Sequence, residues 1–267
     1  MDVYADLVRY WELFGNLFRR DLQAKYRGSA LGVLWTIANP VLLMGVYLLV
    51  FSVVLGARFA DVDHYPLFLL VGLAAWTFFA ASLQSSSRSM LDNANLIRKT
   101  RFPRQLVPLS VVGAHLVGFA VMLAGLLVLD FALLPRVRAT EWLALPLAAC
   151  FVGLVSGLAL AVASLNVIFR DVEFIVAALL LPWFFLTPVI YPLGGVPGLA
   201  ARHHTVVELL HWLNFVTPGI EAIRAPLFWG RMPYWLDVVY LVAATVVSLA
   251  FGAFVFNRVD DQIAIEV

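Results

Sequence analysis

The stretch Phe18–Pro40 reads FRRDLQAKYRGSALGVLWTIANP, and within it a charged run passes through Arg27 and Gly28 into uncharged sequence. No residue from Gly28 to Ala57 carries a formal charge. A helix needs only about 20 apolar residues to cross the hydrocarbon core of a bilayer. We therefore expect the first membrane span inside this run.

The residues before this run have an amphipathic pattern. Apolar side chains recur at three- and four-residue steps from Val3 to Leu22, and charged or polar side chains fill the opposite face. This periodicity predicts a helix, and its Trp and Phe side chains favour a position in the membrane interface. Packing on a partner protein would give the same pattern. We expect residues 1–27 to form a cytoplasmic interface helix ahead of a membrane domain over residues 28–267.

The composition predicts a polytopic membrane protein. Of the 267 residues, 63% are hydrophobic and 13% are charged, whereas soluble domains carry about 25% charged residues. The formal net charge of +1 gives no support for nucleic-acid binding. Cys150 is the only cysteine, so an intrachain disulfide is excluded.

Residues 1–27 lack the apolar core of a signal peptide, and the first span is expected to act as the insertion signal.

Six uncharged windows can each hold one spanning helix: Gly28–Ala57, Tyr65–Ser87, Leu106–Leu129, Trp142–Phe169, Phe174–Ala201 and Val238–Asn257. Backbone groups in hydrocarbon must be satisfied within the segment, and these long runs favour helices over barrel strands. The predicted fold class is therefore all-α, with six transmembrane helices and both ends on one side.

Basic residues are distributed unevenly among the connections. Twelve of the eighteen Lys and Arg residues precede the first window or follow the second, fourth or sixth, and six lie in the other connections. Lys and Arg favour the cytoplasmic side of short loops. Both termini are therefore predicted to be cytoplasmic.

The predicted cytoplasmic loop 87–105 is longer than a turn. Asp92 is expected to cap a short basic helix that runs through Lys99 and stops before Pro103. This helix would project from the membrane.

The predicted external region 193–237 is too apolar for a solvated loop. It contains two helical candidates, Val206–Phe215 and Pro218–Phe228, the second with Thr217 as its cap. We expect both to be short re-entrant helices that dip into the outer leaflet between spans 5 and 6. Glu221 and Arg224 are spaced for an ion pair on the surface of a helix.

The fifth window carries three prolines, Pro182, Pro188 and Pro192. Each removes a backbone donor and strains the preceding turn. The freed carbonyls need partners, so this span is expected to face protein or a cavity rather than lipid.

Enzymatic chemistry has little support in the sequence. The two lysines, Lys25 and Lys99, do not follow glycine, so no phosphate-binding loop exists and nucleotide hydrolysis is not expected. No metal site is expected either, since no metal-ligand spacing is present. An intramembrane protease would suit six spans, but GLVSG around Ser156 better fits small residues at a helix contact. His115 is more simply a polar group bonded inside the bundle than a catalytic base.

Five segments, in their order along the chain, resemble the membrane subunits of ABC-2 type polysaccharide exporters: KYRGSALGVLWTIANP (Lys25–Pro40), NANLIRKTRFPRQLVPLS (Asn93–Ser110), LNVIFRDVEF (Leu165–Phe174), PWFFLTPVIYP (Pro182–Pro192) and NFVTPGIEAIR (Asn214–Arg224). Such subunits export O-antigen, teichoic acid and related lipid-linked glycans across the bacterial cytoplasmic (inner) membrane. The resemblance implies a homodimeric channel in contact with membrane lipids, with two copies of a cytoplasmic ABC ATPase bound underneath. The chain itself would bind no cofactor, and ATP and Mg would bind in the partner.

The resemblance also assigns roles in coupling to the ATPase. The loop helix looks like the coupling helix that enters a groove on the ATPase, and the turn after the fourth window looks like a second, smaller contact. The coupling residues expected on this basis are Asp92, Asn93, Asn95, Leu96, Ile97, Arg98, Lys99, Arg170 and Asp171.

The segment Tyr26–Leu34 looks like the lateral gate near which the lipid pyrophosphate head enters. The candidate phosphate partners are Arg19, Arg20, Lys25, Tyr26 and Arg27, at the level of the headgroups. The positive-inside rule alone would also place cations there.

A minority of the aromatic residues could line a conduit on which sugar rings stack, and the candidates are Tyr47, Phe51, Trp76, Trp183 and Tyr191. The others are expected in interface belts or packing. An ABC-2 exporter of drugs or small amphiphiles shares this architecture and is the alternative function. An intramembrane enzyme is a third, less favoured reading.

Overall fold

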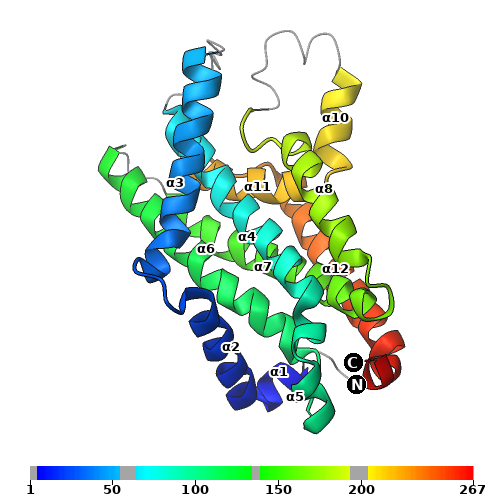
Figure 1. The fold of residues 1–267 in the computed structure, drawn as a ribbon. Coiled ribbons are helices and arrows are strands. Elements are labelled where there is room, and N and C mark those ends of the chain that lie inside the picture. Colours follow the sequence, from blue (N-terminus) through cyan, green and yellow to red (C-terminus); the bar gives the residue numbers. More distant parts are fainter. Residues whose placement is uncertain (1–4, 55–63, 101, 134–138, 193–203, 267) are drawn as a thin grey trace.

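A computed structural model describes residues 5–54, 64–100, 102–133, 139–192 and 204–266 of the chain. Within these ranges the secondary structure is helical and contains no strand, which confirms the all-α prediction (Figure 1). Five helical segments are long and apolar enough to cross a membrane. They coincide with the first four and the sixth of the uncharged windows.

The five segments combine regular helices with short irregular turns. They are α3 (Trp35–Tyr47) with a π-helical extension over Leu48–Val54, α4 (Tyr65–Asp92), α6 (Leu106–Leu133), α7 (Ala144–Ile168) after a 3-10 turn over Glu141–Leu143, and α12 (Trp235–Glu266).

The fifth window contains a shorter helix, α8 (Val172–Leu186), of 15 residues. At about 1.5 Å per residue it covers about 22 Å, less than the roughly 30 Å of a bilayer core. The helix continues through Pro182 and ends before Thr187, the residue that precedes Pro188, because a residue before proline disfavours the helical conformation. The rest of the window, from Leu193 to Ala201, lies outside the described residues.

The end of α8 is buried, and side chains from other helices bind its free carbonyl groups. Arg224 donates from Nη1 to the Pro188 carbonyl at 2.9 Å and from Nη2 to the Val189 carbonyl at 3.3 Å. Tyr65 donates to the Ile190 carbonyl at 2.7 Å. The break after α8 therefore faces protein. The expectation for the whole span is not met within one chain, because α8 exposes large apolar side chains such as Phe174 and Leu181, each at 66% exposed, and Phe184 is its buried residue.

Arg224 lies on one of two short helices, α10 (His204–Trp212) and α11 (Val216–Arg224), which precede a π-helical turn over Ala225–Trp229. In Figure 1, α11 lies across the bundle, in contact with α4, α7 and α12. Two predictions are wrong here. Thr217 lies inside α11 rather than at its cap. The Arg224–Glu221 pair is present, but Arg224 is fully buried and its guanidinium lies 3.8 Å from the ring centre of Phe68.

Helices α7 and α12 pack closely because small residues face each other. A methyl group at Gly157 would overlap the backbone carbonyl of Ser248, and one at Gly252 would overlap the carbonyl of Gly157. Hydroxyl groups add interhelical bonds, since Ser248 donates to the Leu154 carbonyl at 2.7 Å and Thr245 to that of Cys150 at 2.9 Å. The predicted use of GLVSG as a helix contact is thus confirmed.

The N-terminal segment forms α1 (Ala5–Arg9) and α2 (Trp11–Tyr26), which confirms the amphipathic helix. Leu17 is buried against Leu106 and Val107 at the start of α6, whereas Trp11 remains 69% exposed. The apolar face of this segment therefore packs partly on the bundle and is partly free. In Figure 1, α1, α2 and the C-terminal end of α12 lie at one end of the molecule, and α10 lies at the other.

Candidate functional site

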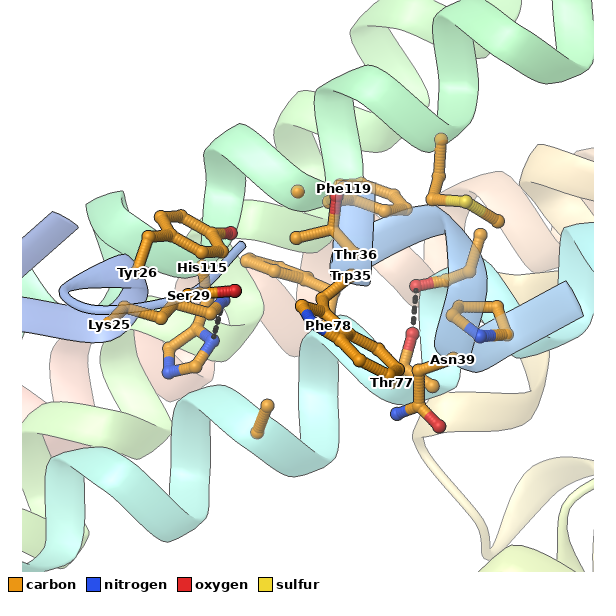
Figure 2. A pocket seen from close by; sticks show the side chains of 15 residues that line it. Lys25, Tyr26, Ser29, Trp35, Thr36, Asn39, Thr77, Phe78, His115 and Phe119 are labelled. Atoms are coloured by element: carbon orange, nitrogen blue, oxygen red, sulfur yellow. Dashed lines mark hydrogen bonds between the residues drawn. The ribbon is translucent and has the colours of Figure 1, made fainter. Parts of the chain in front are cut away.

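Helices α2, α3, α4 and α6 enclose a cavity of about 380 Å³ where α2 ends (Figure 2). Its polar lining residues are Lys25, Tyr26, Ser29, Thr36, Asn39, Thr77 and His115, and its aromatic ones include Trp35, Phe78 and Phe119. Cationic, hydroxyl and aromatic groups therefore meet in one space at the junction of the interface helix with the first span.

The turn between α2 and α3 gives the cavity its shape. Gly28 and Gly32 have φ angles of 76° and 51°, a left-handed conformation that glycine adopts at little cost. The Gly32 N–H donates to Ser29 Oγ at 3.1 Å, which closes the turn. The chain is thus redirected so that Trp35 and Thr36 at the start of α3 line the cavity.

Small residues on α6 allow α2 and α3 to approach it. A Cβ atom at Gly113 would lie 3.2 Å from the Phe18 ring of α2, and one at Gly118 would lie 3.0 Å from the Thr36 methyl group of α3. Both distances are too short for easy substitution. The two glycines therefore set the position of Lys25 relative to α6.

Lys25 and His115 are in direct contact, and Figure 2 shows the bond between them. Lys25 Nζ lies 3.0 Å from His115 Nδ1, and His115 Nε2 lies 3.0 Å from Ser85 Oγ on α4. Because an amino group donates here, His115 Nδ1 accepts, and the imidazole proton is on Nε2, which donates to Ser85. The prediction that His115 is hydrogen-bonded inside the bundle is confirmed.

The cavity environment changes the acid–base behaviour of its α2 residues. Partial burial of the Lys25 ammonium lowers the pKa of Lys25 from its ordinary value, because a low-dielectric surrounding disfavours the charged form. Burial likewise raises the pKa of Tyr26. The Tyr26 hydroxyl oxygen is buried and has no hydrogen-bond partner among the described residues.

The five predicted headgroup residues occupy different places. Lys25 and Tyr26 line the cavity. Arg20 lines an adjacent hollow of about 540 Å³, into which Lys25 and His115 also face, and it pairs with Asp21 at 2.7 Å. Arg19 and Arg27 are exposed and line neither space.

The predicted cytoplasmic loop forms a second region of interest. It contains α5 (Ala94–Lys99), but Asp92 is the last residue of α4 and Asn93 precedes α5 without a side-chain cap, so the predicted Asp92 cap is wrong. Instead, the side-chain amide of Asn93 donates to the Ser89 carbonyl in the last turn of α4 at 2.8 Å.

Helix α5 has a buried side and an exposed side. Ile97 packs in a cluster with Met90 and Val259, which anchors the helix to α4 and α12. Leu96 is partly buried. The exposed positions are Asp92, Asn95, Arg98 and Lys99. This alternation leaves a continuous polar face for a partner.

The turn between α7 and α8 lies beside that face. Arg98 of α5 and Arg170 of the turn line one cavity of about 450 Å³, together with Arg88 and Glu173. Arg88 lies 3.3 Å from Glu173 and 3.8 Å from Asp92. The carboxylate of Glu173 therefore pairs with α4 rather than with Arg170, and Asp171 precedes α8 without forming a side-chain cap. The two predicted coupling segments are adjacent.

Four of the five aromatic candidates lie near one another, around a residue that was not predicted, Phe184 of α8. Tyr47 is 5.6 Å from the Phe184 ring centre and 6.3 Å from Phe51, and Trp76 is 5.5 Å from Phe184 and 6.5 Å from Trp183. Trp76 is only 6% exposed, so within one chain it packs in the core. Tyr191 instead donates to the Phe185 carbonyl at 2.8 Å.

Ser156 and His115 do not form a catalytic pair. Ser156 donates to the Val152 carbonyl in its own helix at 2.8 Å, and both imidazole nitrogens of His115 are bonded to other residues. The protease reading therefore has no geometric support.

Sequence comparisons identify related proteins. A family model described as ABC-2 type transporter matches residues 12–228. An O-antigen export system permease protein, RfbA of Myxococcus xanthus, is 35% identical over 97% of this chain and 96% of its own length. RfbA of Klebsiella pneumoniae is 31% identical over 95% and 94%. The polysialic acid transport protein KpsM of Escherichia coli is 23% identical over 92% of each chain. The chain belongs to the ABC-2 type transporter family, as a multi-pass membrane subunit of a transporter.

Proposed function

We propose that this chain is the channel-forming membrane subunit of an ATP-driven exporter of lipid-linked polysaccharide. The names of its relatives support a glycan substrate, since they are an O-antigen export permease and a polysialic acid transport protein. One structural observation carries the proposal. Helix α5 lies at the end of the bundle that also holds α1 and α2 (Figure 1), next to the α7–α8 turn, and the Lys25 cavity extends from the end of α2 to the middle of α4 and α6. An ATPase contact and a substrate entrance would therefore lie in the same half of the molecule.

The family works with an ABC ATPase, and α5 is the proposed contact. Its free face carries Asn95, Arg98 and Lys99, and Arg170 adds a further cation across the neighbouring cavity. This surface suits an acidic groove on two ATPase copies, which would supply the bound ATP and Mg. The buried Ile97 would transmit the force of the ATPase to α4 and α12.

The proposed substrate entrance is the cavity between α2 and α3. Lys25 provides a cation, and the Tyr26 hydroxyl has no other partner among the described residues. A pyrophosphate head at the membrane surface is the group that such a site would bind. O-antigen, teichoic acid or a similar glycan would follow the head into the channel.

We propose that two copies of the chain enclose the channel. The faces of α3 and α8 expose large apolar side chains, including Leu42 at 61% and Leu181 at 66%. With Cys150 replaced by Ala, single cysteines at Leu42 or Leu181 provide a test by cross-linking in membranes. Dimers that form from Leu42 of α3 and Leu181 of α8 but not from Phe131 of α6 would support this interface. Equal cross-linking at all three positions would contradict it.

The proposed location is the bacterial cytoplasmic membrane with both termini inside. The basic residues of α2, α5 and the α7–α8 turn favour that side, and Arg104 joins the α5–α6 connection to Asp260 near the end of α12 at 2.8 Å. Tags at the two termini that resist protease in intact cells would support this orientation.

The main test is glycan export in cells that depend on this chain. Charge reversal by Arg98→Glu with Lys99→Glu should reduce both ATPase association and surface glycan, while Arg231→Glu at the other end should leave both unchanged. Export of drugs without export of glycan would instead favour the alternative substrate class. Full export by the double variant would show that α5 is not the coupling helix.

A further inference from the structure

The contact between Lys25 and His115 joins two cavities. Both residues line the 380 Å³ cavity toward α3 and the 540 Å³ hollow toward α4. Ser85 of α4, an exposed residue, completes the hydrogen-bonded series from the second side. Three groups that can donate to an oxyanion therefore stand in a row where the two spaces meet.

Of these three groups, His115 can take up one more proton. With Lys25 donating to Nδ1, the His115 ring is neutral, and its second nitrogen donates to Ser85. Protonation of the ring at Nδ1 would give the pair a second positive charge. Nδ1 would then be a donor that faces the Lys25 ammonium at 3.0 Å. Burial of the ring and, in addition, this repulsion keep the pair at a single positive charge when no anion lies beside it.

A bound phosphoryl group would change that balance. Its negative oxygens would attract both nitrogens, so Lys25 Nζ and His115 Nδ1 could each donate to the anion rather than face each other. The ring would then gain one proton from solvent, and Ser85 Oγ would continue to accept from Nε2. The net change is one anion and one proton bound together.

The other charged groups near His115 are already paired. On α2, Arg20 bonds Asp21 at 2.7 Å, and Asp21 also accepts from Ser110 of α6 at 2.6 Å. On α4, Asp92 lies 3.8 Å from Arg88. Tyr26 adds a hydroxyl on the α3 side that has no hydrogen-bond partner among the described residues. The part of α3 that lines the cavity contributes Trp35, Thr36, Asn39 and Pro40, none of which titrates. An incoming anion is therefore balanced by Lys25 and His115.

We propose that Lys25, His115 and Ser85 form a proton-linked site for the phosphoryl group of a lipid pyrophosphate, in which His115 gains a proton when the anion binds. The inference rests on the proposed substrate entrance and adds His115 and Ser85 to it. It predicts that the membrane subunit binds its lipid head more tightly as pH falls.

The test is equilibrium binding of radiolabelled farnesyl pyrophosphate to the purified full-length chain in phosphatidylcholine nanodiscs. Binding should be about tenfold tighter at about pH 6 than at about pH 8, the range in which histidine titrates. The last deprotonation of a phosphoryl group acts in the opposite direction, because a more negative anion binds a cation better. His115→Gln, which keeps one acceptor and one donor, should therefore show only that opposite dependence.

Further variants separate the site from general effects. Lys25→Gln should lose binding at both pH values, and Ser85→Ala, at an exposed hydroxyl, should reduce the pH effect without a loss of folding. His211→Gln, at the far end of the bundle, should leave the pH profile unchanged. If His115→Gln or Ser85→Ala keeps the full wild-type profile, the proton-linked site is wrong.

Competing ligands identify the source of the phosphoryl group. Farnesol should compete poorly, and inorganic pyrophosphate should compete more weakly than the lipid. Equal competition by farnesol would mean that only apolar contact is measured, and equal binding of inorganic pyrophosphate would favour a soluble anion. Both results would overturn the proposal. Proton-linked lipid binding by a chain that exports no glycan would uphold the site and reject the proposed function alone.

Discussion

Helices α3 and α4 are similarly apolar but lie in different surroundings. The most apolar window of α4 has a mean hydropathy of 1.9 and is 78% buried, whereas that of α3 has a mean hydropathy of 2.2 and is 6% buried. Hydropathy alone therefore does not distinguish the centre of the bundle from its edge. In a membrane the two environments are equally apolar, so burial depends on packing and on polar bonds between helices.

The polar bonds differ in the same way. Around α4, α7, α11 and α12, side chains such as Arg224, Asn214 and Ser248 bond to backbone carbonyls of other segments. The outward faces of α3 and α8 carry mainly aliphatic and aromatic side chains. We infer that the first group forms a fixed scaffold and that the second offers surface to lipid or to a second copy.

The largest effect that tests this contrast is expected at Phe151. Its ring is fully buried and lies 6.3 Å from Phe78 and 6.4 Å from Phe119. Phe151→Ala should lower the free energy of unfolding by about 3 kcal/mol, because it leaves a cavity. Denaturant titration in mixed micelles measures the change. Phe131→Ala, at an 81% exposed position of α6, should cost under about 1 kcal/mol. Similar costs would mean that a partner covers Phe131.

A slightly smaller effect is expected from Arg224→Met. The change removes a buried guanidinium from Glu221 and from two carbonyls at the end of α8. Since those groups would remain without their partner, stability should fall by about 2–3 kcal/mol. The same titration measures it. Arg231→Met, which loses only an exposed contact with the Trp229 ring at 5.2 Å, should cost less than about 1 kcal/mol. A loss at Arg231 equal to that at Arg224 would contradict the role of burial.

The smallest of the three effects should come from glycine replacement. Gly157→Ala would place a methyl group on the Ser248 backbone and should cost about 2 kcal/mol through forced separation of α7 and α12. Gly45→Ala on α3 meets no atom within 4 Å and should be neutral or raise stability, because alanine favours helix by about 1 kcal/mol. Melting temperatures of the two variants in one detergent give the comparison. Destabilisation by Gly45→Ala would show that another chain packs on α3.

Much of the fold could be predicted because uncharged windows and amphipathic periodicity are local properties. Five windows correspond to long helices, and α2 follows its pattern. The burial of Arg224 could not be predicted, since its hydrogen-bond partners lie 35 and 36 residues away, where Pro188 ends α8. The prediction of an Asp92 cap was wrong because α4 continues through Asp92 before the chain turns into α5.

The candidate site was predictable in part. The basic end of α2 indicated headgroup contact, and an ionisable residue inside a span directed attention to His115. Their contact joins residues 90 positions apart, and it depends on how far α2 is shifted along α6. That shift follows from the fit of Phe18 against Gly113, which no periodicity in one helix reveals. Ser85 lay in a run of serines without any local signal.

The interlock between α7 and α12 also has a consequence for biosynthesis. A ribosome completes α7 well before α12, the last of the described helices, so the face of α7 around Gly153 and Gly157 stays uncovered while about 80 further residues are made. The same delay leaves α11 without one of its neighbours. Closure of the scaffold therefore has to wait for the synthesis of α12, and a chain that stops before Trp235 should be recognised by membrane proteases as unfinished.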